Sequence, residues 1–324
     1  MKKLLWRVTL GVAAGVAVYV AFSIWADARN VGRALAEFRW SIALAGFGLA
    51  FLNYLVRFGR WHYYLKVLGL DQVPAGHSFL VFLAGFSLTV TPGKLGEVVK
   101  ALLLRESHGI AAARTAPIVI AERFTDLAGL LLLACVGVFS FKTDLRFLAA
   151  GAGLVGLGLV VVSVSPIAAF FLRLSARVPL VRRLTAKLEE AYETTAALLR
   201  PRPLVLGVAL STVSWFFECA AFWAVVRGFP SASVDLQPAT FIYASMTVAG
   251  ALSFLPGGLG VTEAGMLGML AELGTGCGRS VATAATFVTR LCTLWFAVFI
   301  GLAALIVFAR RTHIQVRLPE RTEK

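Results

Sequence analysis

Apolar residues form long runs along the chain, and short polar segments rich in Lys and Arg separate these runs. Runs of roughly 20 apolar residues have the length of a helix that crosses the hydrocarbon core of a bilayer. The pattern therefore predicts an all-α polytopic membrane protein with about six full transmembrane helices. These spans are expected at residues 4–25, 41–56, 117–139, 147–172, 203–226 and 280–309.

Two further apolar segments, 76–104 and 239–273, are interrupted near their centres by Pro-Gly sequences followed by charged residues. Pro and Gly break helices, and each half of such a segment is too short to cross a bilayer alone. Each segment is therefore either one kinked span or a re-entrant hairpin that returns to the side from which it entered. The residues expected at the two tips are Pro92, Gly93 and Gly96, and Pro256, Gly257, Gly258 and Gly260.

The distribution of basic residues favours the re-entrant arrangement. With the N-terminus in the cytoplasm and both broken segments re-entrant, cytoplasmic segments carry 22 Lys and Arg residues and the opposite segments carry 7. This asymmetry is the positive-inside pattern. Arg57 and Arg60 enter that count as interfacial residues, because aromatic residues surround them at the end of span 41–56. A cleaved signal peptide is the alternative for residues 4–25, but the run exceeds the roughly 7–15 residues of a signal core.

The predicted spans divide one membrane domain, 1–324, into two related halves. In order, an N-terminal helix (4–25) precedes the first half (41–172), a cytoplasmic amphipathic connector (173–202), the second half (203–309) and a basic cytoplasmic tail (310–324). A plain solvated linker is the alternative for the connector. Each half contains a span, a broken segment and a span with an arginine, Arg123 or Arg290. The halves begin on opposite sides, so the pattern predicts the inverted-topology repeat common in secondary transporters.

Composition agrees with a membrane protein and excludes other classes. The chain is 59% hydrophobic with a mean hydropathy of +0.82. Its net charge of +14 would suggest nucleic acid in a soluble domain, but here the basic residues flank membrane spans, so no nucleic-acid partner is expected. The four cysteines form no Cys-x-x-Cys pair and the four histidines are scattered, so we expect neither a metal nor another cofactor.

Charged residues within the apolar segments need a specific reason, because a charge at the centre of a bilayer costs at least about 2.5–3.5 kcal/mol. Half-helices that begin after each Pro-Gly sequence direct free N–H groups inward, which favours an anion such as a phosphate. We expect substrate binding by Lys94, Glu97, Arg123, Asp126, Glu263 and Arg290. Glu122 and Glu218 are candidates for ion or proton coupling, and no catalytic residue is assigned. The structural alternatives are a span-end position for Glu122 and Arg123, and pairing of Arg290 with Glu218 or Glu263.

Four motifs resemble one known family. They are Pro-Gly-Lys-Leu-Gly-Glu at 92–97, Glu-Arg-Phe-x-Asp at 122–126, Leu-Pro-Gly-Gly-Leu-Gly-x-x-Glu at 255–263, and Thr-Arg at 289–290. Together they resemble the flippase-like family named after the membrane region of lysylphosphatidylglycerol synthases, over about residues 10–308. The resemblance implies a prokaryotic inner-membrane domain that moves or exposes lipids between leaflets. It also implies functional importance for Pro92, Gly93, Gly96, Glu97, Glu122, Arg123, Asp126, Pro256, Gly257, Gly258, Gly260, Glu263 and Arg290. In the synthases a soluble aminoacyl-transfer domain follows, and this chain is expected to lack it because the sequence stops at Lys324.

The leading hypothesis is a lipid flippase or lipid transporter of the bacterial cytoplasmic (inner) membrane, with both termini in the cytoplasm. Its cargo would carry a polar, phosphate-bearing head. One alternative is an intramembrane transferase that modifies lipids, in which Glu122 and Asp126 would hold a metal or act as acid and base. Another alternative is an accessory scaffold of a lipid or cell-envelope synthesis complex. The partners expected are membrane lipids, with a homodimer and lipid-synthesis enzymes as further candidates.

Overall fold

The computed structural model describes residues 17–18, 20–22, 24–91, 97–138, 153 and 185–312. Every regular element within these ranges is a helix, apart from one isolated β-bridge between Ser233 and Thr275, so the predicted all-α class is confirmed. Several predicted features lie wholly or largely outside the described residues. These are the N-terminal span 4–25, the span 147–172, the tail 310–324 and the tip residues Pro92, Gly93, Lys94 and Gly96.

Among the described residues, three helical runs are long and apolar enough to cross a membrane: α3 (Trp40–Val67), α11 (Pro201–Arg227) and the 34-residue run Arg279–Thr312. The last run comprises α14 (Arg279–Arg290), the π-helical turn η4 (Leu291–Trp295) and α15 (Phe296–Thr312). α6 (Ala112–Val138) has 27 residues and carries charged side chains along its first half. The helix that contains the first of these predicted spans, 41–56, continues without interruption past residue 56 to Val67.

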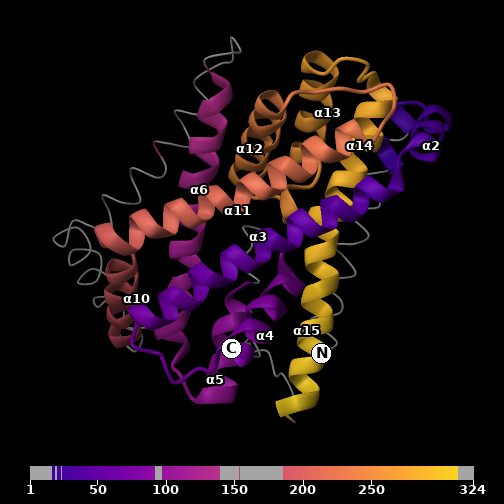
Figure 1. Ribbon diagram of the computed structural model, residues 1–324. Helices are drawn as coiled ribbons and strands as arrows, with labels where there is room; N and C mark the ends of the chain where they lie inside the picture. Colours follow the sequence, from indigo (N-terminus) through magenta and orange to yellow (C-terminus); the bar gives the residue numbers. More distant parts are fainter. Residues whose placement is uncertain are drawn as a thin grey trace, which may run out of the picture.

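α3 and α11 form an antiparallel pair that crosses the molecule (Figure 1). The backbone N–H of Arg39 donates to the carbonyl of Gly228 at 3.1 Å, which joins the start of α3 to the end of α11. Midway along the pair, the Asn53 side-chain amide donates to the Ser214 carbonyl at 2.8 Å. We call the end of the bundle with Arg39 the Arg39 end. The opposite end, where Leu68 follows α3, is the Leu68 end.

Hairpin 1 is defined as residues 75–108 and begins and ends at the Leu68 end. It comprises α4 (Ala75–Gly85), the short 3-10 helix η1 (Phe86–Leu88) and α5 (Val99–His108). The rings of His77 and His108 are 4.7 Å apart, so the start of α4 lies beside the end of α5. The next helix, α6, also begins at this end, because Arg114 Nη2 donates to the Leu68 carbonyl at 2.6 Å.

Hairpin 2 is defined as residues 236–273 and begins and ends at the Arg39 end. It comprises α12 (Leu236–Leu252), the 3-10 turn η3 (Pro256–Gly258) and α13 (Val261–Leu273). Ser233 and Thr275, which flank the hairpin, exchange two backbone hydrogen bonds of 2.9 Å. The Gln237 side chain donates to the Val136 carbonyl at 3.0 Å, which ties the start of α12 to the end of α6.

The turn of hairpin 2 meets Val90 of hairpin 1 in the interior. Gly257 adopts a left-handed backbone conformation with φ of 62°, which favours glycine. A Cβ atom at this position would lie 3.6 Å from Val90 Cγ1 and 3.5 Å from Leu294 Cδ2. Val90, which follows η1 in hairpin 1, therefore packs beside the turn of hairpin 2, and both lie against η4 in one apolar cluster.

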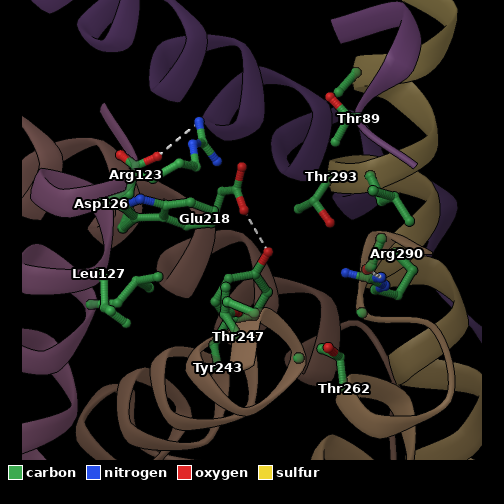
Figure 2. Close-up of a pocket in the computed structure, with 18 of the residues that line it drawn as sticks. Thr89, Arg123, Asp126, Leu127, Glu218, Tyr243, Thr247, Thr262, Arg290 and Thr293 are labelled. Carbon is green, nitrogen blue, oxygen red and sulfur yellow. Dashed lines mark hydrogen bonds and ion pairs between the residues drawn. The ribbon is translucent and has the colours of Figure 1, made fainter. Parts of the chain in front are cut away.

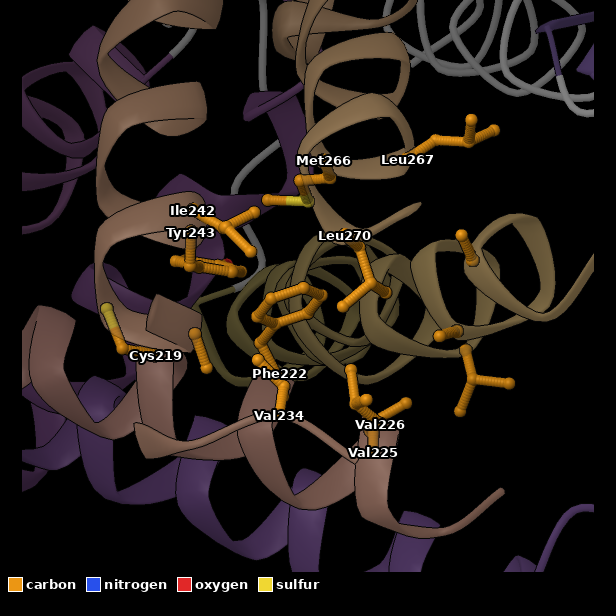
Figure 3. Close-up of a cluster of buried hydrophobic side chains, with 14 of the residues drawn as sticks. Cys219, Phe222, Val225, Val226, Val234, Ile242, Tyr243, Met266, Leu267 and Leu270 are labelled. Atoms are coloured by element: carbon orange, nitrogen blue, oxygen red, sulfur yellow. The ribbon is translucent and has the colours of Figure 1, made fainter. Parts of the chain in front are cut away.

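Apolar side chains hold hairpin 2 against the long helices. Figure 3 shows Phe222 of α11 lying between Ile242 of α12 and Leu270 of α13, and all three side chains are fully buried. Elsewhere, α2 (Ala28–Glu37) is capped by Asp27 and packs on α14. The predicted connector 173–202 contains α10 (Thr185–Leu198), which packs on α6, and its cytoplasmic position stays a prediction.

Candidate functional site

A cavity of about 270 Å³ lies between the turn of hairpin 2, Phe86 and Thr89 of hairpin 1, and the long helices. Figure 2 shows Arg123 and Asp126 on one side of it, Arg290 on the opposite side, and Glu218 between them. Apolar and aromatic side chains make up most of the lining, with a few charged and hydroxyl groups. The charged and polar members are Tyr54, Arg57, Thr89, Arg123, Asp126, Glu218, Tyr243, Thr247, Thr262, Arg290 and Thr293.

Seven charged residues, six of them buried and Arg123 partly buried, form one group at the side of the cavity that faces the Leu68 end; we call it the Asp126 network. Its members are Arg57 and Arg60 of α3, Glu97 and Lys100 of hairpin 1, and Glu122, Arg123 and Asp126 of α6. Arg123 Nη2 bridges Glu97 Oε2 at 3.0 Å and Asp126 Oδ2 at 3.1 Å. Arg60 Nη1 lies 2.8 Å from Asp126 Oδ1. The network thus ties α6 to α3 and to hairpin 1.

The interfacial interpretation of Arg57 and Arg60 is wrong. Their side chains are 5% and 0% exposed, and both belong to the Asp126 network. The aromatic residues near them are also interior, since Trp61 and Tyr64 are fully buried. The sequence signal that was available is helical spacing, because positions 57 and 60 are three apart and share one face of a helix. Recognising it required knowing that α3 continues past residue 56.

Glu122 and Lys100 form the tightest contact of the network, with 2.5 Å between Glu122 Oε2 and Lys100 Nζ. Both side chains are buried, and the Lys100 ammonium also lies 4.6 Å from the ring centroid of Trp61. The sequence offered Glu122 as a coupling residue. The structure places it deep in an ion pair rather than in the lining of the cavity.

A second ion pair fixes the turn of hairpin 2. Arg290 Nε lies 2.6 Å from Glu263 Oε1, and Arg290 Nη2 donates to the Gly257 carbonyl at 2.6 Å. The other carboxylate oxygen of Glu263 accepts from the Gly260 backbone N–H at 2.7 Å, which caps the start of α13. Of the two partners that the sequence allowed for Arg290, the structure selects Glu263.

The two ion pairs correspond. In each predicted half, a glutamate just after the Pro-Gly break pairs with an arginine on the next long helix, 26 residues later for Glu97 and 27 for Glu263. Each pair therefore fastens one hairpin to the helix that follows it. These four predicted site residues come together in two pairs, and Arg123 and Arg290 reach the same cavity.

Glu218 lies in the wall of the cavity, where the Tyr243 hydroxyl donates to its Oε2 at 2.5 Å (Figure 2). It is the one predicted coupling residue that lines the cavity within the part of the chain that the structure describes. Tyr54 on α3 stands nearby and donates to the Thr293 carbonyl at 2.9 Å, within η4. Sequence analysis missed both tyrosines, because an aromatic residue in an apolar run carries no sign of which way it faces.

Metal ligation finds no support in residues 24–91, 97–138 and 185–312, which contain no group of three or more His, Cys, Asp or Glu side chains that could hold an ion. The four cysteines are free. Cys277 lies in the loop before α14, where burial raises the pKa of its thiol. A thiol with a raised pKa is less nucleophilic, as expected for an inert packing residue.

Comparisons with known proteins identify relatives over most of the chain. A sequence model of the family described as the lysylphosphatidylglycerol synthase TM region matches residues 12–301. Two proteins of Methanothermobacter thermautotrophicus (strain Delta H), each described as a UPF0104 membrane protein, are also similar. One is 25% identical over 77% of this chain and 80% of its own length. The other is 26% identical over 89% of this chain and 90% of its own length.

Proposed function

Because the chain belongs to the family of the lysylphosphatidylglycerol synthase TM region, we propose that it is a lipid flippase or lipid transporter. It moves a lipid with a phosphate-bearing head between the two leaflets of the cytoplasmic membrane. The observation that carries this proposal is the cavity, in which arginines from both halves face a space with apolar walls.

The cavity suits the head of a lipid rather than a whole lipid. Its volume of about 270 Å³ is close to the lower end of the range for small-molecule sites. Two of its lining residues, Phe254 and Leu255, are 69% and 43% exposed and form an apolar rim. Acyl chains lie along this rim in the bilayer while the head occupies the interior. A free polar solute has no apolar part that could contact this rim, whereas a lipid has acyl chains, so the rim favours a lipid as cargo.

The two hairpins are proposed to be re-entrant and to enter from opposite faces of the membrane. Support comes from their ends, which lie together at the Leu68 end for hairpin 1 and at the Arg39 end for hairpin 2. The Leu68 end faces the cytoplasm in this proposal. Without the buried Arg57, Arg60 and Lys100, the segments assigned to the cytoplasm still carry 19 basic residues against 7.

Transport follows from alternate opening of the two sides. Hairpin 2 and the apolar contact between Val90 and Gly257 separate the cavity from one face, and hairpin 1 with the Asp126 network separates it from the other. Movement of each hairpin against the paired helices α3 and α11 exposes the cavity to each face in turn, a form of the gating around a fixed site that is common in inverted repeats. No chemical step is proposed, because the Glu122 and Asp126 carboxylates are occupied by Lys100 and Arg60.

A scrambling assay tests the proposal. Purified protein is reconstituted into liposomes with fluorescent phospholipids of several head-group classes, and a membrane-impermeant quencher reports the fraction that changes leaflet. We expect protein-dependent movement of at least one phosphate-headed class. Movement no faster than in protein-free liposomes for every class, with and without an ion gradient, contradicts the proposed function.

A cross-link tests the alternation. Val90→Cys and Gly257→Cys are combined in a background in which the four native cysteines are replaced by serine or alanine. Oxidation to the disulfide should stop movement, and a reductant should restore it, because the two turns can then separate again. Each single-cysteine variant under the same oxidant is the matched control. Full movement through the cross-linked protein would refute a mechanism that needs these turns to part.

A further inference from the structure

We propose that Arg57 is the oxyanion-binding residue of the cavity, a role for which the sequence pattern indicated Lys94, Arg123 and Arg290 instead. The inference rests on the proposed function and adds the atom-level site for the head. The ligand chemistry is a phosphate-type oxyanion, which occurs in a phospholipid head and in inorganic phosphate. Arg57 lines the cavity and lies near the middle of α3.

Two of the three guanidinium nitrogens of Arg57 make no hydrogen bond within the described part of the chain. Its side chain is buried, yet Nε and Nη2 have no hydrogen-bond partner among the described residues. The nearest carboxylate oxygens lie 3.7 Å away on Asp126 and 4.0 Å away on Glu97, beyond the roughly 3.2 Å limit of a good N–H···O bond. A buried donor without a partner is costly and rare in proteins, so it calls for a ligand.

The other two arginines of the cavity make closer contacts with the protein, although Arg123 Nε also has no hydrogen-bond partner among the described residues. Arg123 Nη2 is shared between Glu97 and Asp126, at 3.0 and 3.1 Å. Arg290 uses Nε for Glu263 and Nη2 for the Gly257 carbonyl, both at 2.6 Å. An oxyanion that took Nη2 of Arg123, or Nε and Nη2 of Arg290, would break contacts that hold a hairpin in place. Arg57 can bind an oxyanion without that loss.

The surroundings of Arg57 fit a residue that binds and releases an oxyanion reversibly. Its guanidinium carbon lies 5.2 Å from the Phe86 ring centroid and 5.7 Å from that of Trp215, so two aromatic faces hold the planar group in position. If an oxyanion draws Arg57 away, Asp126 keeps Arg60 at 2.8 Å and Arg123 at 3.1 Å. The carboxylate therefore stays compensated in both states. The fork of the guanidinium suits two oxygens of one phosphate.

Arg57 also lies on an element that keeps its place when the hairpins move. α3 is joined to α11 by hydrogen bonds from Arg39 and Asn53, and neither helix belongs to a hairpin. A head bound to Arg57 can therefore remain in one place while access changes from one face to the other.

A binding measurement in detergent tests the inference with the full-length protein. The probes are short-chain phosphatidic acid, a short-chain diacylglycerol with the same acyl chains, and inorganic phosphate. The variants are Arg57→Gln, which removes the charge, and Arg57→Lys, which keeps the charge and loses the fork. Arg105→Gln is the matched control, because Arg105 is exposed and outside the cavity. Monodispersity and Tm are recorded for each variant, so that loss of fold is distinguished from loss of binding.

We expect wild-type protein and Arg105→Gln to bind phosphatidic acid and not diacylglycerol. Arg57→Gln should bind roughly 10- to 100-fold more weakly, since it loses charge-assisted hydrogen bonds, and Arg57→Lys should be intermediate. If inorganic phosphate also binds and its binding is weakened by the same Arg57 substitutions, the site accepts the free ion as well as the lipid head. Equal affinity of wild type and the folded Arg57 variants for every phosphate probe overturns the inference. Leaflet movement that persists in Arg57→Gln would overturn the Arg57 site and leave the proposed transport function intact. Arg57-dependent binding without any leaflet movement would support the Arg57 site and contradict the transport function.

Discussion

The ion pair between Glu263 and Arg290 allows a quantitative test of what holds hairpin 2. Glu263 is fully buried and accepts two hydrogen bonds, from Arg290 Nε at 2.6 Å and from the Gly260 N–H at 2.7 Å. The substitution Glu263→Gln keeps the shape but replaces one acceptor oxygen with an NH₂ donor. One of the two existing donors then faces another donor, and Arg290 loses its counterion.

The expected cost follows from these contacts. Removing one partner of a buried pair destabilises a protein by about 3–5 kcal/mol, mostly because the remaining charge is left uncompensated. At about 2 °C per kcal/mol for a chain of this size, the Tm should fall by roughly 6–10 °C. The double variant Glu263→Gln/Arg290→Met removes both charges, so its Tm should lie closer to wild type than the sum of the single changes predicts.

The assay is thermal unfolding in detergent, followed by intrinsic fluorescence and by loss of the monodisperse peak. The matched control is Glu106→Gln, since Glu106 pairs with Arg105 at 3.2 Å on the surface. An exposed pair contributes about 0–1 kcal/mol, so this change should move the Tm by roughly 2 °C or less. If Glu263→Gln lowers the Tm no more than Glu106→Gln does, the pair does not hold the turn and the reasoning fails.

Three further results are expected. Gly301→Ala should lower the Tm, because a Cβ there would collide with the backbone of Ser87, whereas Gly268→Ala, with open space, should not; equal Tm values would contradict this packing. Phe254 has a φ of 54°, so Phe254→Gly should relieve about 1 kcal/mol of backbone strain. The same change removes an exposed side chain of the apolar rim and should slow lipid movement. An unchanged rate of lipid movement would show that the rim has no part in the mechanism. Cys277 should resist maleimide at pH 7 and react faster as pH rises, because its buried thiol has a raised pKa; fast labelling at pH 7 in the native protein would show that the thiol is accessible.

Much of the helical framework could be predicted from the sequence, because the length of apolar runs is a direct consequence of bilayer thickness. The break at Pro256 was equally visible, since Pro and Gly leave a local mark on the chain. The spacing of Glu97 from Arg123 and of Glu263 from Arg290 suggested a relation, and the structure pairs both. These are features that depend on position along the chain alone.

The membership of the site was harder to predict, because it depends on which way side chains face. Arg57 and Arg60 stand next to aromatic residues at the end of an apolar run, a pattern that usually marks an interface. Burial was possible only because Asp126 and its neighbours on α6 supply opposite charge from about 65 residues away. A pattern of single residues contains no information about such a partner. The same limit hid Tyr54 and Tyr243, whose hydroxyl groups have partners on other helices.

The wide turn Leu291–Trp295 has a consequence for insertion and deletion along this helix. A π-helical turn holds one residue more than an α-helical turn, so every side chain after it is rotated by about 100° relative to a regular continuation. Removing one residue between 291 and 295 would restore a regular helix and turn Arg290 and Gly301 out of register with each other. Arg290 could then reach Glu263 only if Gly301 left the backbone of Ser87. The number of residues in this turn, more than their identity, therefore allows the ion pair of Arg290 with hairpin 2 and the contact of Gly301 with hairpin 1 to form at the same time.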